Sequence, residues 1–236
     1  MVDYMRKRVY KHVLKYHKAG KMLELNAGTG IDALFFHSQG FEVYATDNAP
    51  GMIDTLKSKL SANDKIHPFL CDFENIENMQ EYAPFDSIYS NFGGLNCTAN
   101  LFSVLEKCFA LLQPKGKMTI VVMPKNCPWE WIELLTFKPK IAFRRYKKQQ
   151  NTNLENVSFT TFYYNPKEIV SVLKEKASII GWEGLCSICP PSYKTKLIKH
   201  LPFFWKSLAY IENKISKWRI IRSYADYVIL TFEKKS

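Results

Sequence analysis

Short apolar runs alternate with amphipathic stretches along the first half of the chain, and each apolar run predicts a buried strand. Strands that alternate with helices predict an α/β fold, in which a parallel sheet carries helices on both faces. A helix is also expected at the N-terminus, where residues 1–18 are amphipathic and basic. The expected strands are residues 21–24, 41–47, 66–71, 85–90 and 118–123.

The alternation breaks after Met123 and resumes with a helix that Asn165 and Pro166 begin. A chain of 236 residues that is 47% hydrophobic can bury one sizeable core. We therefore expect a single domain, residues 1–236, with insertions at 124–164 and 190–218. The later segments are an aromatic helix from 124, a basic stretch at 138–148, a polar turn at 150–156, a strand or lid hairpin at 157–164, a sixth strand at 178–189, a helical stretch at 193–218 and a last strand at 223–233.

The turn after the first strand carries the most specific local pattern, Glu24-Leu-Asn-Ala-Gly28-Thr-Gly30-Ile-Asp. Glu24 is costly in a buried strand unless it has partners. Gly28 and Gly30 allow a tight turn and a close approach of the backbone to a ligand. Strand, glycine turn and helix N-terminus together form a nucleotide-sized cradle. Residues 28–33 also fit the dinucleotide fingerprint G-x-G-x-x-G/A, so an NAD site is the competing interpretation.

Ordered motifs over about residues 20–125 resemble those of class I S-adenosylmethionine (SAM)-dependent methyltransferases. Motif I is matched by Glu24, Gly28 and Gly30, and Asn26 stands where the family has its first glycine. This departure is mild, because Asn tolerates a positive φ angle. The other matching segments are Phe41–Asp47 with its terminal carboxylate, the third strand ending at Asp72-Phe73, the fourth strand and loop at 85–94, and the Leu-x-Pro-x-Gly turn at 112–116.

Within this family the chain most resembles bacterial small-molecule methyltransferases with Leu-Glu-Leu-Asn-Cys-Gly-Thr-Gly-Glu-Asp at motif I, and it departs from them at Ala27 and Ile31. Those enzymes carry a further stretch before the first helix, with a Tyr-Asp pair that folds over SAM. Here Met1 lies almost at that helix. Either the lid is absent or the sequence begins inside it.

The resemblance implies a Rossmann-like, seven-stranded methyltransferase sheet with helices on both faces, an antiparallel last strand and helical insertions after strands five and six. It implies SAM as the cofactor and S-adenosylhomocysteine as its product. Asp47 would hold the ribose hydroxyls, Asp72 the adenine amino group, and Met52 would pack on adenine. The expected cofactor-binding residues are Glu24, Asn26, Ala27, Gly28, Gly30, Asp32, Asp47, Asn48, Met52, Cys71, Asp72, Phe73, Asn91, Phe92 and Gly93.

The net charge of +11 and the pI near 9.3 raise the question of an anionic partner. Lysines are spread over most surface segments, so a solvated basic surface is the simplest interpretation. Neither an RNA-binding appendage nor the Asn/Asp-Pro-Pro-Tyr/Phe tetrad of many base methyltransferases is visible. A small-molecule acceptor is therefore preferred, and a nucleic-acid methyltransferase and a non-catalytic SAM-binding fold remain the alternatives.

The six cysteines show no disulfide framework. Cys186 and Cys189 fall in the expected sixth strand, where positions three apart point to opposite faces, so neither zinc nor a redox pair is expected. Free thiols indicate a reducing cytoplasm. No metal-ligand constellation is visible, and no apolar run reaches the roughly 18 residues of a membrane span.

Both insertions leave the carboxyl edge of the sheet, where open α/β sheets bind ligands, so they should roof the methyl acceptor. Ten of their aromatic residues, among them Trp129 and Tyr193, indicate a largely apolar or aromatic acceptor, although packing of an added helical layer is the simplest role for any one of them. The general-base candidates are Tyr193, Glu130, Tyr163 and His200. The other histidines, which lie on expected surface helices or at a far strand end, are assigned structural roles.

The helical stretch near the C-terminus has one apolar face, which Leu201, Phe204, Leu208 and Ile211 help to form, with lysines elsewhere. Such a helix could lie on an anionic membrane. Packing of this face onto the core is the expectation. The oligomeric state is left open.

Overall fold

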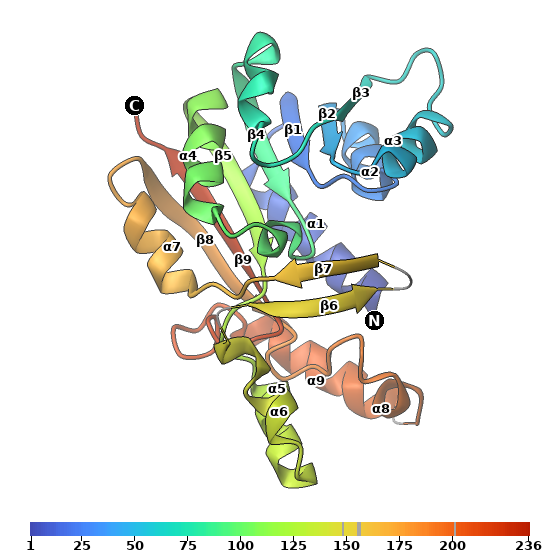
Figure 1. The fold of residues 1–236 in the computed structure, drawn as a ribbon, viewed down its shortest axis with the longest axis vertical. Coiled ribbons are helices and arrows are strands. Elements are labelled where there is room, and N and C mark those ends of the chain that lie inside the picture. Colours follow the sequence, from blue (N-terminus) through green and yellow to red (C-terminus); the bar gives the residue numbers. More distant parts are fainter. Residues whose placement is uncertain (148, 155–156, 201) are drawn as a thin grey trace.

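A seven-stranded sheet with strand order β3-β2-β1-β4-β5-β9-β8 runs through the protein (Figure 1). Strands β1 to β5 are parallel, and β9 is antiparallel to both of its neighbours. The predicted α/β fold with an antiparallel last strand is therefore confirmed. This computed structural model describes residues 1–147, 149–154, 157–200 and 202–236; Leu201, assigned above to an apolar helix face, lies outside them.

The strands are β1 (Lys21–Leu25), β2 (Glu42–Asp47), β3 (Ile66–Leu70), β4 (Phe85–Ser90), β5 (Leu112–Val122), β8 (Ala177–Leu185) and β9 (Tyr227–Lys234), with a separate antiparallel hairpin of β6 (Gln150–Leu154) and β7 (Val157–Thr161). The α-helices are α1 (Val2–Tyr16), α2 (Ile31–Ser38), α3 (Pro50–Lys57), α4 (Leu101–Leu111), α5 (Pro128–Trp131), α6 (Pro139–Ala142), α7 (Pro166–Leu173), α8 (Thr195–His200) and α9 (Pro202–Ile215). Short 3₁₀ turns are η1 (Ile76–Tyr82), η2 (Gly94–Cys97), η3 (Ile132–Thr136) and η4 (Arg144–Tyr146).

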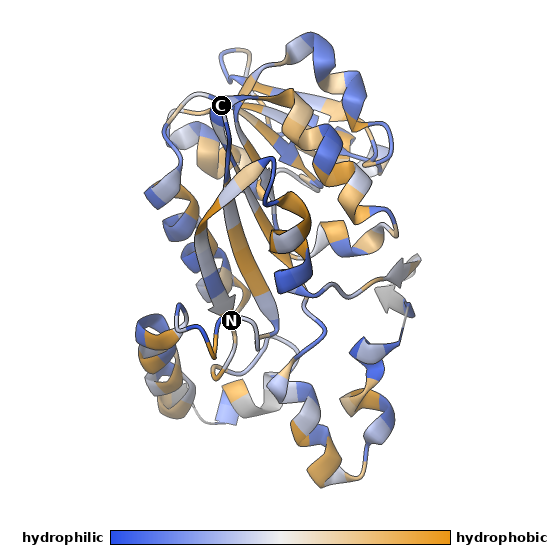
Figure 2. Cartoon of the chain, turned by 90° about the vertical axis from the view of Figure 1, so that its left-hand side faces the viewer, coloured by the Kyte–Doolittle hydropathy of each residue, from blue (hydrophilic) through white to orange (hydrophobic). Residues whose placement is uncertain are grey.

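Each face of the sheet has its own apolar core. On one face α1 contributes Met5, Val9 and Val13, which lie four residues apart and so form one stripe of the helix. Helices α4 and α7 cover the other face. Figure 2 shows apolar residues along the central strands between these layers.

Two histidines that the sequence assigned to surface helices are in fact buried. His12 bonds Glu183 and Thr231 at 2.8 Å each, and the His17 ring nitrogens lie 2.8 and 2.7 Å from the hydroxyls of Ser87 and Thr119. The face of α1 that covers the sheet carries these rings inward. Burial lowers the pKa of His17 to about 3, which keeps the ring neutral. The structural role expected for both residues stands, but their surface position was wrong.

The two insertions follow β5 and β8; their helices α5, α6, α8 and α9 form the lower end of the molecule, and the hairpin β6–β7 of the first insertion lies above them (Figure 1). The expected polar turn at 150–156 was wrong in its first part, because Gln150–Leu154 pairs with Val157–Thr161 as the hairpin β6–β7. Asn165 caps α7 as expected, accepting from the Lys167 N–H at 3.0 Å. Within the described part of the chain no helix is both long and apolar enough to cross a bilayer.

The sixth strand ends four residues earlier than expected, at Leu185. Cys186 adopts φ 57°, and Glu212 of α9 accepts backbone N–H groups from Cys186, Ile188 and Cys189 at 2.9–3.0 Å. The chain therefore curls instead of remaining extended. Both cysteines lie beyond the end of the strand, so their expected position on opposite faces of it was wrong. All six cysteines, each of them described, are free thiols.

Candidate functional site

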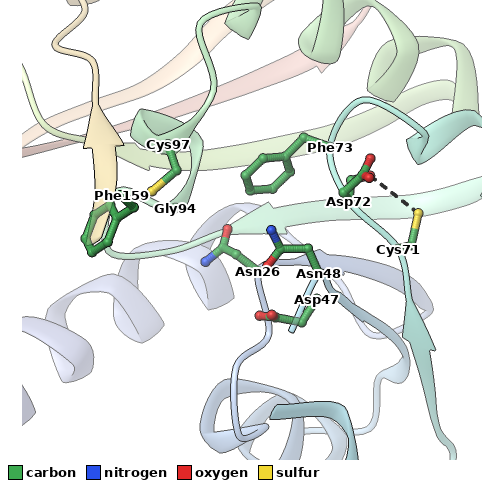
Figure 3. Close-up of a pocket in the computed structure, with 9 residues that line it drawn as sticks. All are labelled: Asn26, Asp47, Asn48, Cys71, Asp72, Phe73, Gly94, Cys97 and Phe159. Carbon is green, nitrogen blue, oxygen red and sulfur yellow. Dashed lines mark hydrogen bonds between the residues drawn. The ribbon is translucent and has the colours of Figure 1, made fainter. Parts of the chain in front are cut away.

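A cavity of about 300 Å³ lies at the carboxyl ends of β1, β2 and β3 (Figure 3). Six of the expected cofactor-binding residues line it, and three further residues close it from above. The expected six are Asn26, Asp47, Asn48, Cys71, Asp72 and Phe73; the additional three are Gly94, Cys97 and Phe159.

The glycine turn fixes the carboxylate at the end of β2. Gly28 has φ 56°, and a Cβ built on it would meet no atom within 4 Å, so the open side of the turn leaves room for a ligand. Its N–H donates to Asp47 Oδ2 at 2.8 Å, and the Ala49 N–H donates to Asp47 Oδ1 at 3.0 Å. Each carboxylate oxygen has further acceptor capacity. Asp47 is thus held in one orientation while still able to accept ribose hydroxyls.

Asn26 joins the end of β1 to the end of β4. Its φ of 50° confirms that this position needs the left-handed region, which explains why Asn can replace glycine here. Asn26 Nδ2 donates to the Asn91 carbonyl at 3.0 Å, and Ser90 Oγ donates to Asn26 Oδ1 at 2.6 Å. A Cβ on Gly94 would lie 2.2 Å from Asn26 Cγ. The Asn26 side chain therefore requires glycine at position 94.

Glu24 is an acidic side chain inside the sheet, just below this turn. It is buried, and its Oε2 has no hydrogen-bond partner among the described residues. Burial raises its pKa to about 8, with Arg6 opposing and Asp47 adding to the shift. A buried carboxyl with an unpaired oxygen beside a ligand cradle fits a cationic group on the ligand.

Asp32, also expected to bind cofactor, is instead held by other side chains. It forms an ion pair with Arg6 and accepts hydrogen bonds from Tyr10 at 2.7 Å, Tyr89 at 3.0 Å and Asn91 at 2.7 Å. These partners come from α1, β4 and the loop after β4. In this arrangement Asp32 anchors the N-terminal helix to the motif I turn.

The remaining expected residues border the turn without lining the cavity. Gly30 caps α2 with φ 79°, and a Cβ on it would strike Leu56, so packing requires glycine there. Phe92 lies 4.9 Å below the Arg6 guanidinium. The Ala27 N–H donates to the Thr46 carbonyl, and the Gly93 N–H donates to the Val121 carbonyl. Met52 is exposed on α3.

The hairpin that supplies Phe159 is tied firmly at its base. Asn96, fully buried in η2, accepts from the Met123 N–H at 2.8 Å and donates to the carbonyls of Met123 and Phe162 at 3.0 and 2.5 Å. Phe162 N–H returns a bond to the Asn96 carbonyl at 2.7 Å. Alternation over 157–164 indicated a lid hairpin, but only its three-dimensional position shows that Phe159 reaches the cavity (Figure 3).

Three of the four general-base candidates meet around two arginines. Glu130 accepts from Arg144 at 2.7 and 2.9 Å and from Arg145 at 2.6 Å. The Tyr163 ring lies 5.2 Å from the Arg145 guanidinium. The Tyr193 ring lies 6.0 Å from the Arg144 guanidinium. Glu130 would have to break these ion pairs to act as a base.

The fourth candidate, His200, is exposed at the end of α8. None of the four lines the cavity as the structure describes it. Cys127, Glu130 and Asp226 bring ligand-type atoms within 4.8 Å of one another. Arg145, however, bonds both Glu130 and Asp226 at 2.6 Å and so supplies the positive charge in this group.

Comparison with known proteins gives a consistent result. A family model described as a methyltransferase domain matches residues 22–116. Comparison with curated protein sequences finds no match. Among solved structures, the CcbJ methyltransferase from Streptomyces caelestis is similar with a TM-score of 0.62 and 14% identity, over 98% of this chain and 95% of that one.

Two further structures share the fold. A SAM-dependent methyltransferase from Clostridium acetobutylicum ATCC 824 has a TM-score of 0.61 and 11% identity, over 99% of this chain and 91% of that one. The Burkholderia thailandensis 1,6-didemethyltoxoflavin-N1-methyltransferase, solved with 1,6-didemethyltoxoflavin and S-adenosylhomocysteine, has a TM-score of 0.57 and 17% identity, over 99% and 79%. At such identities the likeness is one of fold.

Proposed function

We propose that this chain, a class I SAM-dependent methyltransferase by its domain match and its fold, transfers the SAM methyl group to a small, largely apolar or aromatic acceptor. The observation that carries the proposal is the cavity at the carboxyl edge, with Asp47 and Asp72 on one side and Phe159 on the other (Figure 3). A pair of carboxylates on successive strand ends suits a nucleoside with donor groups at both ribose and base.

The residues present fit SAM on three counts. Asp47 is held by two backbone N–H groups in position for ribose hydroxyls. Asp72, fixed by bonds from Asn75 at 2.9–3.1 Å, can accept from an adenine amino group. The unpaired Glu24 oxygen fits the cationic end of the cofactor.

SAM, when bound, supplies an activated methyl group, so the chain needs mainly to position the two reactants. Asn26 holds the motif I turn against the loop after β4, which would fix the cofactor relative to the acceptor side. Phe159 and the hairpin β6–β7 would exclude water from the closed site. A general base is required only for an oxygen acceptor, and Tyr193 and Tyr163 remain our candidates for it.

The surroundings of the cavity support a small apolar or aromatic acceptor. Phe73 and Phe159 give it aromatic walls. The Burkholderia enzyme of the same fold was solved with bound 1,6-didemethyltoxoflavin. By contrast, the basic hollow of about 590 Å³ between α1 and α9 shares no lining residue with the cofactor cavity. This separation favours a small molecule over a nucleic acid as the acceptor.

Calorimetric titration with SAM, S-adenosylhomocysteine and NADH tests the cofactor. We expect both sulfur ligands to bind and NADH not to bind. Asp47→Ala should weaken SAM binding by about 1–3 kcal/mol, the usual cost of losing a charge-assisted acceptor. Asp72→Ala should weaken it less, because Asp72 is exposed and the adenine amino group can be rehydrated.

Two results would overturn the assignment: binding of NADH without SAM, or an unchanged SAM dissociation constant in Asp47→Ala. Transfer of labelled methyl from SAM to a panel of aromatic hydroxy, amino and thiol compounds tests the acceptor class. Binding of SAM without transfer to any of these compounds or to RNA would favour a non-catalytic role.

A further inference from the structure

The positive charge of the chain is concentrated in the two insertions. Residues 124–164 contain seven Lys and Arg residues against three acidic ones, and residues 190–218 contain six against one. Together they have a net charge of +9, out of +11 for the entire chain. The rest of the protein therefore has a net charge of only +2. Lysines do occur along most of the chain, as expected, but acidic residues nearly balance them outside the two insertions.

The first insertion also displays apolar side chains at its tip. Leu135, in η3, is 80% exposed, and Phe137, between η3 and α6, is 94% exposed. Phe137 adopts φ 54°, a left-handed conformation that is unfavourable for a bulky side chain and that Asn or Gly adopts more readily. The turn itself thus gives no reason for an aromatic residue. Lys138 and Lys140 follow directly, so the tip is both apolar and basic.

The second insertion presents a similar combination on α9. The helix turns Ala209, Glu212 and Ser216 inward, because Glu212 binds the N–H groups after β8 and Arg8 of α1. Its apolar side is left partly uncovered: Phe204 and Ile211 are about half exposed. The expectation that this apolar face packs onto the core therefore holds only in part: Trp205, Leu208 and Ile215 are half-buried, with Trp205 against Tyr4 of α1, whereas Phe204 and Ile211 are not covered.

At the start of α9, Phe203 is 84% exposed. Lys199 and Lys206 lie four residues before it and three after it in the chain. The helices of both insertions lie at the same end of the molecule in the two views (Figures 1 and 2). This end, defined by residues 132–146, 194–200 and 202–222, is called the basic apolar end below.

We propose that the basic apolar end docks on the surface of an anionic lipid bilayer. Exposed Leu and Phe side chains can enter the acyl boundary, and lysines beside them can pair with lipid phosphates. A second copy of the chain is a poorer occupant, because it would bring two faces of the same charge together. Nucleic acid explains the lysines but leaves the exposed Leu135 and Phe137 without a role. The inference does not depend on methyl transfer.

Co-sedimentation with vesicles, without SAM, tests the proposal. We expect binding to phosphatidylcholine vesicles that contain about one third phosphatidylglycerol, weak binding to pure phosphatidylcholine, and a loss of binding as salt is raised. Phe137→Asn suits the left-handed backbone and removes the apolar ring. This variant and Phe203→Ser should each weaken vesicle binding about tenfold, the effect expected from removing one inserted aromatic side chain.

Val172→Asn, on α7, is the matched control, because Val172 is exposed but lies outside the basic apolar end. It should bind vesicles like the parent protein. Thermal unfolding and SAM titration of all three variants, expected to match the parent, show that the fold is intact. Failure of the parent to bind anionic vesicles, or equal binding by Phe137→Asn and Phe203→Ser, would overturn the proposal. The proposal would also be overturned if the parent protein were a dimer that these two substitutions convert to a monomer. The basic apolar end would then serve self-association.

Discussion

Replacing Glu24 by Gln removes a buried carboxyl whose pKa burial raises to about 8. The ordinary pKa of a solvated glutamate carboxyl is 4.5. Between these two pH values the unfolded chain has released the proton and the folded chain still binds it. Stability therefore falls as pH rises through this window. Below pH 4.5 both states are protonated, so Glu24 adds no pH dependence there.

The size of the effect follows from the two pKa values. One pKa unit corresponds to about 1.36 kcal/mol, so the cost of Glu24 is below about 1 kcal/mol at pH 5 and approaches about 4 kcal/mol at pH 8. Glu24→Gln cannot ionise and lacks this slope. The free energy of unfolding of the parent, relative to the variant, should therefore fall by about 3 kcal/mol between pH 5 and pH 8.

Urea unfolding of the parent and of Glu24→Gln at several pH values measures the difference between their free energies of unfolding. The contributions of the histidines and other titrating groups are the same in both proteins and so cancel in this difference. Glu175→Gln serves as the control, because that side chain is exposed and its substitution should leave the pH curve unchanged. The parent should also bind SAM more tightly as pH rises from 6 to 8, since a cationic ligand favours the ionised Glu24. Parallel stability curves for parent and Glu24→Gln would refute the reasoning, because Glu24 would then be ionised in the fold.

Two further predictions concern the cavity and its roof. Gly94→Ala should weaken SAM binding at least tenfold, because its Cβ would lie 2.2 Å from Asn26 Cγ. The double variant Asn26→Gly/Gly94→Ala should recover most of the lost affinity. Calorimetry on the two single variants and the double variant tests this, and additive losses of affinity would contradict the clash. Tyr193→Ala should lower turnover or acceptor affinity while leaving SAM affinity unchanged, whereas an equal loss of both in paired titrations would indicate a purely structural roof residue.

The parts of the molecule that the sequence predicts well are those that depend on local backbone requirements. The strand ends at Asp47 and Asp72 follow from the alternation of elements, and both residues line the cavity. Asn26 was expected to adopt a positive φ angle and does so. Such features need no knowledge of distant partners. The seven-stranded topology with its antiparallel last strand, by contrast, was implied by the resemblance to the methyltransferase family and not by any local pattern.

Contacts between distant segments account for what the sequence did not predict. Phe159 reaches the cavity only because Asn96 ties the base of its hairpin to the ends of β5 and η2. Asp32, assigned to the cofactor, bonds Arg6 of α1 instead. No local pattern distinguishes a carboxylate that binds a ligand from one that binds a helix twenty-six residues away.

Helix α9 shows how one buried charge can override hydrophobic periodicity. Packing Phe204 and Ile211 inward would gain about 1.5–3 kcal/mol for each fully buried side chain. Turning Glu212 outward would instead leave three N–H groups after β8 without their acceptor, and would leave Arg8 with Glu183 as its remaining partner. Each unpaired buried group costs about 1–3 kcal/mol, so these polar bonds together offset the gain from burying the apolar face. The apolar residues remain exposed for that reason, and the surface that results is the one for which a membrane partner is proposed.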